Sequence, residues 1–463
     1  SIVFGCIFFK LHAQINIPDI NFKKALLEEG VDKNNDGEIQ IEEAESVESL
    51  DVAFQNITEI SGIEHFKNLK IFDCFENEIS NLDFSQNLLL ESLKCSRCPI
   101  ENLNISQNTN LQELICASAE LTELNVSNNT SLVRLICSNN TISELDLSNN
   151  QELVTLEISS NTVEELDLRN NLKLKFLNCK LNQLKSLDLS HNLELENLTC
   201  GSNPLGELEI SKNERIRRLT CVENELNHLD VSNQTELVSL TCSYNNLSEL
   251  DLSSNPLLMQ LTVRNNQLDA IDVRKNPELI TLFCERNNLT SLDVTNLDKL
   301  EMLNCFENQI TELDLSNNGN IGIVTCYKND LRCINIHNGA NEEIKFENNP
   351  KLSNICVDQE QLRDIRNAVD MENYNCNVSI HCTADELSFQ VFPIPASDIV
   401  HIYRNGKGEF NYSLYDFRGQ LIFREVTSHK IDVSQLPEGL YLLEVFDIQS
   451  NERSVKNIFV ERG

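Results

Sequence analysis

The sequence is poor in aromatic residues and in basic residues, and both shortages exclude classes of protein. It contains no tryptophan, and aromatic residues make up 6% of the chain although 40% of its residues are hydrophobic. This mixture predicts a core of leucine, isoleucine and valine rather than a compact, aromatic-rich domain. Lysine and arginine number 37 against 72 aspartates and glutamates, which gives a formal net charge of −35. A nucleic acid or an anionic membrane would need a positive surface, so neither is expected as a partner.

Long apolar runs and catalytic signatures are also missing from the sequence. No segment after the N-terminal residues approaches 18 uninterrupted apolar residues, so no membrane span is expected. The chain has no GxSxG, HExxH, P-loop or GxGxxG pattern. Its eight histidines are scattered and acidic pairs occur throughout, so neither marks a catalytic centre. We therefore expect a protein that is not an enzyme.

A strict repeat of 21 residues fills the middle of the chain. Each unit reads approximately LxxLxCxxNxLxxLDLSxNxx, as in residues 237–257. Apolar residues at i and i+2 place two side chains on one face of a strand. We therefore predict a mainly β parallel solenoid with one strand at LxC and a second at LDL. The repeat begins at thirteen positions: Leu69, Leu90, Leu111, Leu132, Leu153, Leu174, Leu195, Ile216, Leu237, Leu258, Leu279, Leu300 and Ile321.

Two columns of asparagine follow the two predicted strands. An asparagine amide in a turn bonds to neighbouring backbone, and stacking the units would align these amides into ladders. The first column holds Asn77, Asn140, Asn161, Asn182, Asn203, Asn224, Asn245, Asn266, Asn287, Asn308 and Asn329. The second holds Asn87, Asn108, Asn129, Asn150, Asn171, Asn192, Asn213, Asn255, Asn276 and Asn318.

The unit resembles the short 21-residue leucine-rich repeat of bacterial surface proteins, over residues 50 to 344. The resemblance implies recognition of a ligand on a strand face, without catalysis. It does not name the ligand, which remains a protein or a polysaccharide.

Most of the 17 cysteines belong to the repeat. Ile158 and Val263 fill the two gaps in their column, so the position is inward and apolar, and we expect these thiols to be reduced and buried. Neighbours in the column would lie roughly 4.8 Å apart, too far for an easy disulfide. Cys98, which forms a CxxC with Cys95, falls in the first asparagine column and receives the same structural interpretation. The column is Cys74, Cys95, Cys116, Cys137, Cys179, Cys200, Cys221, Cys242, Cys284, Cys305 and Cys326.

An acidic column marks the outward position of the second strand. Stacked carboxylates repel by roughly 1 kcal/mol per adjacent pair at the dielectric constant of water. Hydrogen bonds to turn amides and serine hydroxyls would offset this repulsion, and weak divalent-cation binding is the alternative. The column holds Asp83, Asp146, Asp167, Asp188, Glu209, Asp230, Asp251, Asp272, Asp293 and Asp314, with Asn104, Asn125 and Asn335 in three other units.

Larger side chains gather on the first strand face near its C-terminal end. Exposed aromatic and arginine groups are typical interface anchors. We interpret Phe283, Arg286, Phe306 and Tyr327 as a possible partner-contact patch, and ordinary surface variation is the alternative.

Residues 32–43, DKNNDGEIQIEE, fit the twelve-residue EF-hand loop. Asp32, Asn34 and Asp36 would supply side-chain oxygens, Glu38 its backbone carbonyl and Glu43 a bidentate carboxylate. Residues 22–29 and 42–47 suit flanking helices. The segment resembles a single EF-hand, and its place before the repeats resembles the helical cap of internalin-type proteins. We expect one structural Ca²⁺ site, and a cap that keeps the shape without the ion is the alternative.

Repeat grammar fades after residue 344. Residues 348–382 carry Cys356, Cys376 and Cys382, and a bridge from Cys356 to either of the others could seal the end of the solenoid in an exported protein. Short alternating strands with Gly and Pro turns then predict a small β-sandwich.

Three pieces of this last region carry a second resemblance. They are FQVFPIPASD at 389–398, LYDFRG at 414–419 and LPEGLY at 436–441. In this order they resemble the sorting domain of type IX secretion in Bacteroidota, although the usual asparagine is missing at 394. The resemblance implies contact with the type IX machinery and export to the surface or medium, and a permanent binding sandwich is the alternative.

The N-terminal residues 1–14 are apolar, end near a small-residue site, and resemble the tail of a signal peptide. A buried first strand and a lipoprotein box at residues 3–6 are the alternatives. The predicted organisation is 1–14 signal-peptide remnant, 15–49 EF-hand-like cap, 50–345 solenoid, 346–386 C-terminal cap and linker, and 387–463 sorting domain. We expect an exported recognition or adhesion protein, and the alternative is a passive structural or calcium-buffering surface-layer protein.

Overall fold

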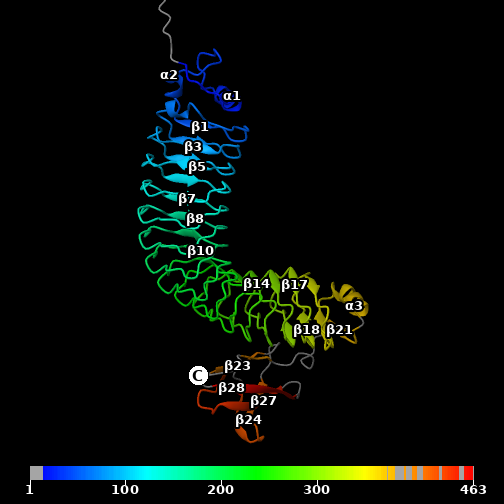
Figure 1. The fold of residues 1–463 in the computed structure, drawn as a ribbon. Coiled ribbons are helices and arrows are strands. Elements are labelled where there is room, and N and C mark those ends of the chain that lie inside the picture. The colour runs from blue at the N-terminus through cyan, green and yellow to red at the C-terminus, as the bar shows by residue number, and fades with distance from the viewer. Residues whose placement is uncertain are drawn as a thin grey trace, which may run out of the picture. The chain divides into compact units, whose positions relative to one another are not determined.

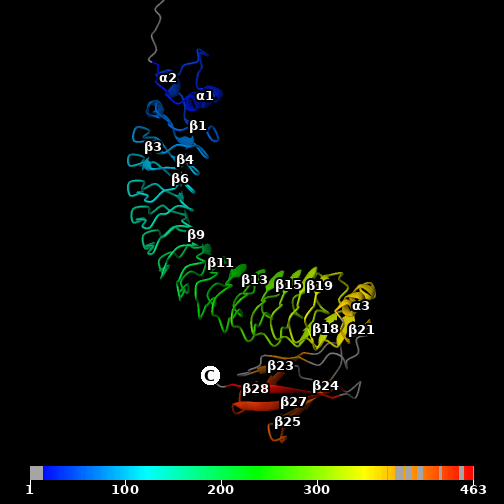
Figure 2. The ribbon, with the colours of Figure 1, turned by 45° about the vertical axis from the view of Figure 1, so that its right-hand side comes forward.

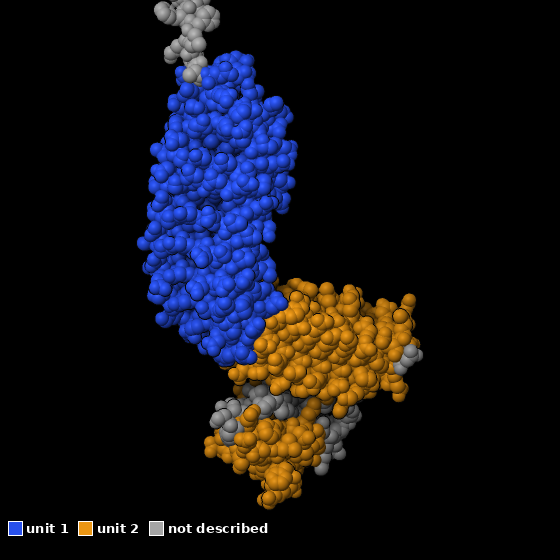
Figure 3. All heavy atoms as spheres, in the orientation of Figure 1, with its two compact units in different colours: residues 1–234 blue, residues 235–463 orange. Residues whose placement is uncertain are grey.

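The computed structural model describes residues 14–372, 374–380, 390–392, 399–403, 410–426, 430–447 and 453–461. The chain forms two compact units, residues 1–234 and 235–463, which are described separately (Figure 3). The predicted signal segment lies outside the described residues, apart from Gln14. In the described part of the chain, no helix has the length and apolar character needed to cross a membrane.

Unit 1 begins with a short helical cap and continues as a parallel β-solenoid (Figure 1). Neighbouring strands pair in a constant register, so Leu198 faces Leu177 on one side and Leu219 on the other. The cap contains α1 (Ile20–Glu28) and α2 (Ile41–Ala44), and η1 (Ile63–His65) follows in the first coil. The main sheet runs in the order β1 (Ser49–Asp51), β2 (Ile71–Asp73), β4 (Ser92–Lys94), β6 (Glu113–Ile115), β7 (Arg134–Ile136), β8 (Thr155–Glu157), β9 (Phe176–Asn178), β10 (Asn197–Thr199) and β11 (Arg218–Thr220), while β3 (Asn81–Asp83) pairs with β5 (Asn102–Asn104).

Unit 2 has the same solenoid pattern and ends in two small antiparallel sheets (Figure 2). Its first parallel series is β12 (Ser239–Thr241), β13 (Gln260–Thr262), β14 (Thr281–Phe283), β15 (Met302–Asn304), β17 (Ile323–Thr325) and β19 (Glu343–Lys345). A second parallel sheet contains β16 (Glu312–Asp314), β18 (Cys333–Ile336), β20 (Asn354–Val357) and β21 (Asn377–Ser379), and α3 (Leu362–Met371) lies between the last two in sequence.

The predicted C-terminal sandwich is present as two antiparallel sheets that share one core. Val400, Ile431, Leu443 and Ile458 are among its fully or nearly fully buried residues. The hydroxyl of Tyr441 donates a hydrogen bond to the carbonyl of Pro437 at 2.7 Å. One sheet orders β22 (Gln390–Phe392), β23 (Ile399–Tyr403) and β26 (Lys430–Asp432), and the other orders β25 (Leu421–Val426), β24 (Phe410–Asp416), β27 (Gly439–Asp447) and β28 (Arg453–Val460).

The repeat columns form the core of the solenoid, as predicted. All eleven column cysteines are free and buried, and Ile158 and Val263 take the same fully buried position. The first-column asparagines bond to backbone on both sides. In Asn161, for example, Nδ2 donates to the carbonyls of Cys137 and Ile158 at 3.0 and 3.1 Å, and Oδ1 accepts from the backbone N–H of Ile142. The amides of the first column therefore pair with backbone N–H and carbonyl groups of the buried turns. In the second column, Nδ2 donates to backbone carbonyls, as in Asn150, whose Oδ1 has no partner among the described residues.

The second predicted strand is largely absent from the middle coils. The LDL segment forms hydrogen-bonded strands near the two ends of the solenoid, at β3–β5 and at β16–β18–β20–β21. In the middle coils of unit 1, few backbone hydrogen bonds join neighbouring coils close to this segment. One of them runs from the N–H of Thr141 to the carbonyl of Leu121 at 2.9 Å. The side chain that accepts the N–H of residue i+2 does so both in the middle coils and in the coils that form this strand, as at Asp146 and Asp314, so this bond does not account for the difference.

Each first strand leads into a turn that contains a left-handed residue other than glycine. The φ angles lie between 52° and 58° in all thirteen cases. The residue types vary, so residue identity does not predict this conformation. The series is Glu76, Arg97, Ser118, Asn139, Ser160, Leu181, Ser202, Glu223, Tyr244, Asn265, Arg286, Glu307 and Lys328.

Candidate functional site

The predicted calcium loop has the backbone shape of its motif. Gly37 has a φ of 83°, as the sharp turn requires, and Ile39 is fully buried. The Ile39 carbonyl accepts the N–H of Ile15 at 2.8 Å. Gln14 and Gln40 form an isolated antiparallel β-bridge. Residues 14–15 therefore occupy the side of the loop where a second EF-hand would pair. Both flanking helices are present, although α2 is only four residues long.

Hydrogen bonds within the loop hold most of the predicted ligand side chains. Asp32 accepts the N–H groups of Asn35 and Gly37 at 2.7 and 2.9 Å. Glu43 accepts the N–H groups of Lys33 and Gln40 at 2.9 and 3.0 Å.

The loop has oxygen donors of the kind that calcium prefers, but its acidic groups are not gathered around one point. Among the described residues, no group of three or more His, Cys, Asp or Glu side chains is placed to hold a metal ion. The Gln40 amide nitrogen lies 3.2 and 3.1 Å from the two carboxylate oxygens of Asp36 and 3.5 Å from the carbonyl of Glu38. The Gln40 amide group thus lies beside the oxygens that would coordinate a cation. Asn34 in turn donates a hydrogen bond to the side-chain oxygen of Gln40.

The cap is joined to the first coil through Asp19. This carboxylate accepts the N–H of Phe22 at the start of α1, and also the N–H and hydroxyl of Thr58 at 2.8 and 2.7 Å. Partial burial acts to raise the pKa of Asp19, but these bonds outweigh it and the net pKa is lowered. One side chain therefore caps the N-terminus of α1 and fixes the helix to the solenoid.

The side chains of the acidic column accept hydrogen bonds in the turns that follow the LDL segments. Asp146, for example, accepts the N–H of Ser148 at 2.9 Å, and this bond lowers the pKa of the carboxyl. Asn104 and Asn125 accept from Ser106 and Ser127 in the same way, at 3.3 and 3.0 Å. An amide performs the role as well as a carboxylate, so hydrogen bonding accounts for the column, as the first of the two interpretations predicts.

A third asparagine ladder, which the sequence analysis missed, runs beside the second one. Asn128, Asn149 and Asn170 donate to the carbonyls of the serines 22 residues earlier at 3.0 to 3.1 Å. The sequence signal for this ladder is an asparagine directly before each asparagine of the second column, as Asn149 stands before Asn150 in the segment SNN.

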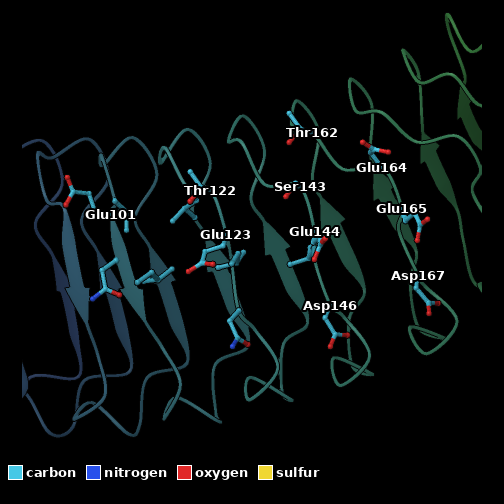
Figure 4. A pocket seen from close by; sticks show the side chains of 17 residues that line it. Glu101, Thr122, Glu123, Ser143, Glu144, Asp146, Thr162, Glu164, Glu165 and Asp167 are labelled. Atoms are coloured by element: carbon cyan, nitrogen blue, oxygen red, sulfur yellow. The ribbon is translucent and has the colours of Figure 1, made fainter.

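An acidic groove of about 960 Å³ lies on the second face of unit 1 (Figure 4). No lysine or arginine lines it. Two of its acids have basic partners outside the lining, in the pairs Glu164–Lys185 and Asp167–Arg169, both at 2.9 Å. Figure 4 shows that its carboxylates recur from coil to coil. They belong to Glu101, Glu123, Glu144, Asp146, Glu164, Glu165 and Asp167.

The predicted contact patch in unit 2 is partly a stack of side chains. The rings of Phe306 and Tyr327 lie 4.5 Å apart at an interplanar angle of 14°. The Arg286 guanidinium lies 5.8 Å from the Phe306 centroid, and Lys328 lies 5.9 Å from the Tyr327 centroid. Phe283 lies on strand β14, between Thr262 and Asn304 in the ladder. The structure thus brings three of the four predicted residues together.

Strand β14 belongs to a sheet face without charged side chains. On β12, β13, β14, β15 and β17, all ten outward positions are uncharged and at least partly exposed. On the N-terminal strands of unit 1, by contrast, the corresponding positions hold ion pairs such as Lys94–Asp73 and Arg134–Glu113, both at 3.8 Å. Strands β9 and β10 of unit 1 are also uncharged at these positions, but the uninterrupted series of five strands lies in unit 2. We call this surface the uncharged face; it consists of Ser239, Thr241, Gln260, Thr262, Thr281, Phe283, Met302, Asn304, Ile323 and Thr325.

The cysteines outside the repeat differ from one another. Cys356 is disulfide-bonded, whereas Cys376 is a half-buried free thiol. A bridge between these two is therefore excluded, and Cys382, the other predicted partner, lies outside the described residues.

Comparison with solved structures identifies the solenoid type. The chain is similar to the functional domain of InlJ from Listeria monocytogenes, described as including a cysteine ladder, with 26% identity and a TM-score of 0.64 over 92% of this chain and 93% of that one. It is also similar to the internalin inlF of the same organism, with 21% identity and a TM-score of 0.59 over 70% and 94% of the two chains. YopM from Yersinia enterocolitica gives 21% identity and a TM-score of 0.50 over 67% and 78%. The fold is a leucine-rich-repeat solenoid of the internalin type.

The C-terminal region has its own match. Residues 390–461 match the family described as the secretion system C-terminal sorting domain. A stretch of 57 residues is 39% identical to beta-agarase D from Zobellia galactanivorans, but it spans only 12% of each chain, so the agarase's activity does not transfer. The chain therefore combines an internalin-like solenoid with a type IX sorting domain, and it is secreted or attached to the outer-membrane surface.

Proposed function

We propose that this exported chain is a recognition protein that binds a macromolecular partner through the uncharged face of its solenoid. The observation that supports the proposal is the absence of charge over five consecutive strands in a chain whose net charge is −35. The centres of protein interfaces are depleted in charged residues and enriched in methionine and aromatic residues. Phe283, Met302 and Ile323 provide such a centre, and five strands at about 4.8 Å spacing span roughly 19 Å.

A binding array of immobilised proteins and polysaccharides tests this proposal. We expect the full chain to bind at least one component, and the double variant Thr262→Asp/Met302→Glu to lose that binding. The matched control Thr155→Asp/Asn178→Glu adds the same charge at outward positions of unit 1 on β8 and β9, away from β12, and should bind normally. Equal binding by all three proteins would place the contact elsewhere, and the proposal would fail.

We also propose that the cap binds one calcium ion. The support is the loop shape around Gly37 and the oxygen donors of Asp32, Asn34, Asp36, Glu38 and Glu43. Binding would have to replace the bonds that Glu43 accepts from the backbone. Calorimetry should therefore compare wild type with Glu43→Gln, which keeps an acceptor for those N–H groups, and with Glu45→Gln as a nearby control. We expect calcium heat in wild type and in the control but not in Glu43→Gln; no heat in wild type would refute the site.

The acidic groove supports a second candidate function, the weak accumulation of cations. Glu123, Glu144 and Glu165 line it from successive coils and have no ion-pair partner among the described residues. Equilibrium dialysis with calcium separates the two functions. One bound ion per chain fits a recognition protein with a structural cap, whereas many weakly bound ions that disappear in Glu123→Gln/Glu144→Gln/Glu165→Gln fit a buffering layer.

A further inference from the structure

The border of the uncharged face carries information about the partner. Arg264, Arg286 and Lys328 follow strands β13, β14 and β17, and each has about half of its side chain exposed. Two carboxylates lie next to these three cations. Glu307 pairs with Arg286 and Lys328 at 2.9 and 2.7 Å, and Glu285 lies 3.9 Å from Arg264. Glu347 follows Tyr327 in the same ladder position, which makes three acids in all, but Glu285 is buried. The exposed groups are therefore three cations and two acids, which leaves the surface of this border slightly positive within a strongly acidic molecule.

One of the acids at this border, Glu285, is buried rather than exposed at the surface. Glu285 is 4% exposed, and one of its carboxylate oxygens has no hydrogen-bond partner within the described residues. Burial raises the pKa of the Glu285 carboxyl, and the nearby Arg264 and Arg286 act in the opposite direction. The middle coils of unit 1 carry small polar residues at the equivalent positions, as at 138–139 and 159–160. A cation–ring contact recurs only at the N-terminal coils of unit 1 among the described residues, where Arg97 lies over Phe75 and pairs with Glu76.

The aromatic side chains of the border are already covered. One face of Phe306 meets Tyr327, and the cationic groups of Arg286 and Lys328 lie over the two rings. A sugar ring binds an aromatic side chain by packing its C–H groups on an open ring face, because the electron-rich face is the attractive surface. This stack offers ring edges and cations instead. The stack therefore offers a polysaccharide little surface to bind. Apolar side chains can pack on its ring edges, and carboxylates can pair with its cations.

We propose, resting on the function proposed above, that the partner is a protein segment with an apolar centre and carboxylates along one border. Its apolar residues pack on Phe283, Met302 and Ile323, and its carboxylates meet Arg286 and Lys328. The net charge of −35 repels an acidic segment from the rest of the surface, so the positive border fixes both the place and the orientation of docking.

Panning a phage library of random 12-residue peptides against the full chain tests the inference. We expect enriched peptides to combine apolar residues with aspartate or glutamate. Their affinity should fall at least tenfold in Arg286→Gln/Lys328→Gln and in Met302→Glu, and it should weaken with salt. The controls Arg218→Gln and Glu123→Gln/Glu144→Gln/Glu165→Gln should bind as wild type does.

Three results would overturn the inference. Enriched peptides that are basic, or that bind the border variant as tightly as wild type, contradict the proposed chemistry. Array binding to polysaccharides alone, abolished by Thr262→Asp/Met302→Glu, would keep the recognition function and refute the protein partner. A dimer in light scattering that dissociates in Met302→Glu would show that a second copy of this chain covers the face.

Discussion

Single side chains close the turns of this solenoid, and the acidic column shows how. Asp188 accepts the backbone N–H of Ser190 at 2.9 Å, and bonds from Ser190 lower the pKa of this carboxyl. Asn104 and Asn125 perform the same role without charge. The acceptor oxygen, rather than the negative charge, is therefore what the turn requires.

The variants Asp188→Asn and Asp188→Ala separate these two properties. We expect the Asn variant to melt like wild type at pH 7 and the Ala variant to melt at a lower temperature, as followed by circular dichroism. The folded pKa lies below the ordinary value of 3.8, so the carboxylate stabilises the fold above about pH 4 and this stabilisation is lost as the pH falls through the folded pKa. Wild type should lose more stability than Asp188→Asn between pH 5 and pH 2; equal losses would contradict the account.

The left-handed turn residues give a second prediction. Leu181 has a φ of 55° and is half-exposed. The left-handed conformation costs an L-residue about 1–2 kcal/mol, and glycine avoids this cost while losing about 0.5–1 kcal/mol through chain entropy. Leu181→Gly should therefore be as stable as wild type or up to about 1 kcal/mol more stable in urea unfolding. Leu172→Gly, which replaces a similarly exposed leucine without positive φ, should be less stable; the reverse order would refute the strain.

At the scale of the strand and its turns, the repeat alone predicted the first strand, the inward cysteine column and the asparagine ladders. Each of these depends on a side chain whose chemistry shows in the sequence. The second strand was overpredicted, because the LDL pattern recurs in every coil whereas neighbouring LDL segments pair as strands only near the ends of the solenoid. The left-handed turns escaped prediction because any residue type occupies them. The uncharged face was visible only after Thr262, Phe283 and Asn304 had been placed in register.

The cysteine column should behave as a packed apolar element. Burial raises the pKa of Cys137, Cys200 and Cys242 to about 12, so these thiols stay protonated at neutral pH. Among the described free cysteines, only Cys376 is not fully buried. Counting thiols with iodoacetamide and mass spectrometry should label Cys376 in the native protein and the column only after denaturation. Rapid native labelling of the column, or its oxidation to disulfides, would contradict the inward packing.

At the scale of the whole molecule, the solenoid and the sorting domain have separable roles. Contacts in a solenoid are made between neighbouring coils, so its stability depends little on a domain that follows it. We expect a chain that lacks residues 387–463 to fold but to remain in the periplasm of a Bacteroidota host, whereas the full chain reaches the surface or the medium. Cell fractionation decides the location and circular dichroism the folding. A truncated chain that is still exported would refute the sorting role, and one that unfolds would show structural dependence.

The most direct measurement of the recognition function is photo-crosslinking at the uncharged face. In a Cys6→Ser/Cys376→Ser background the buried column thiols do not react, so Thr262→Cys is the accessible free thiol among the described residues and can be labelled with a benzophenone maleimide in the full chain. The matched label at Thr155→Cys lies on the equivalent face of unit 1. Illumination with the component bound in the array should give a covalent adduct from position 262 and none from position 155. Equal adducts from both positions, or none from position 262, would contradict binding through this face.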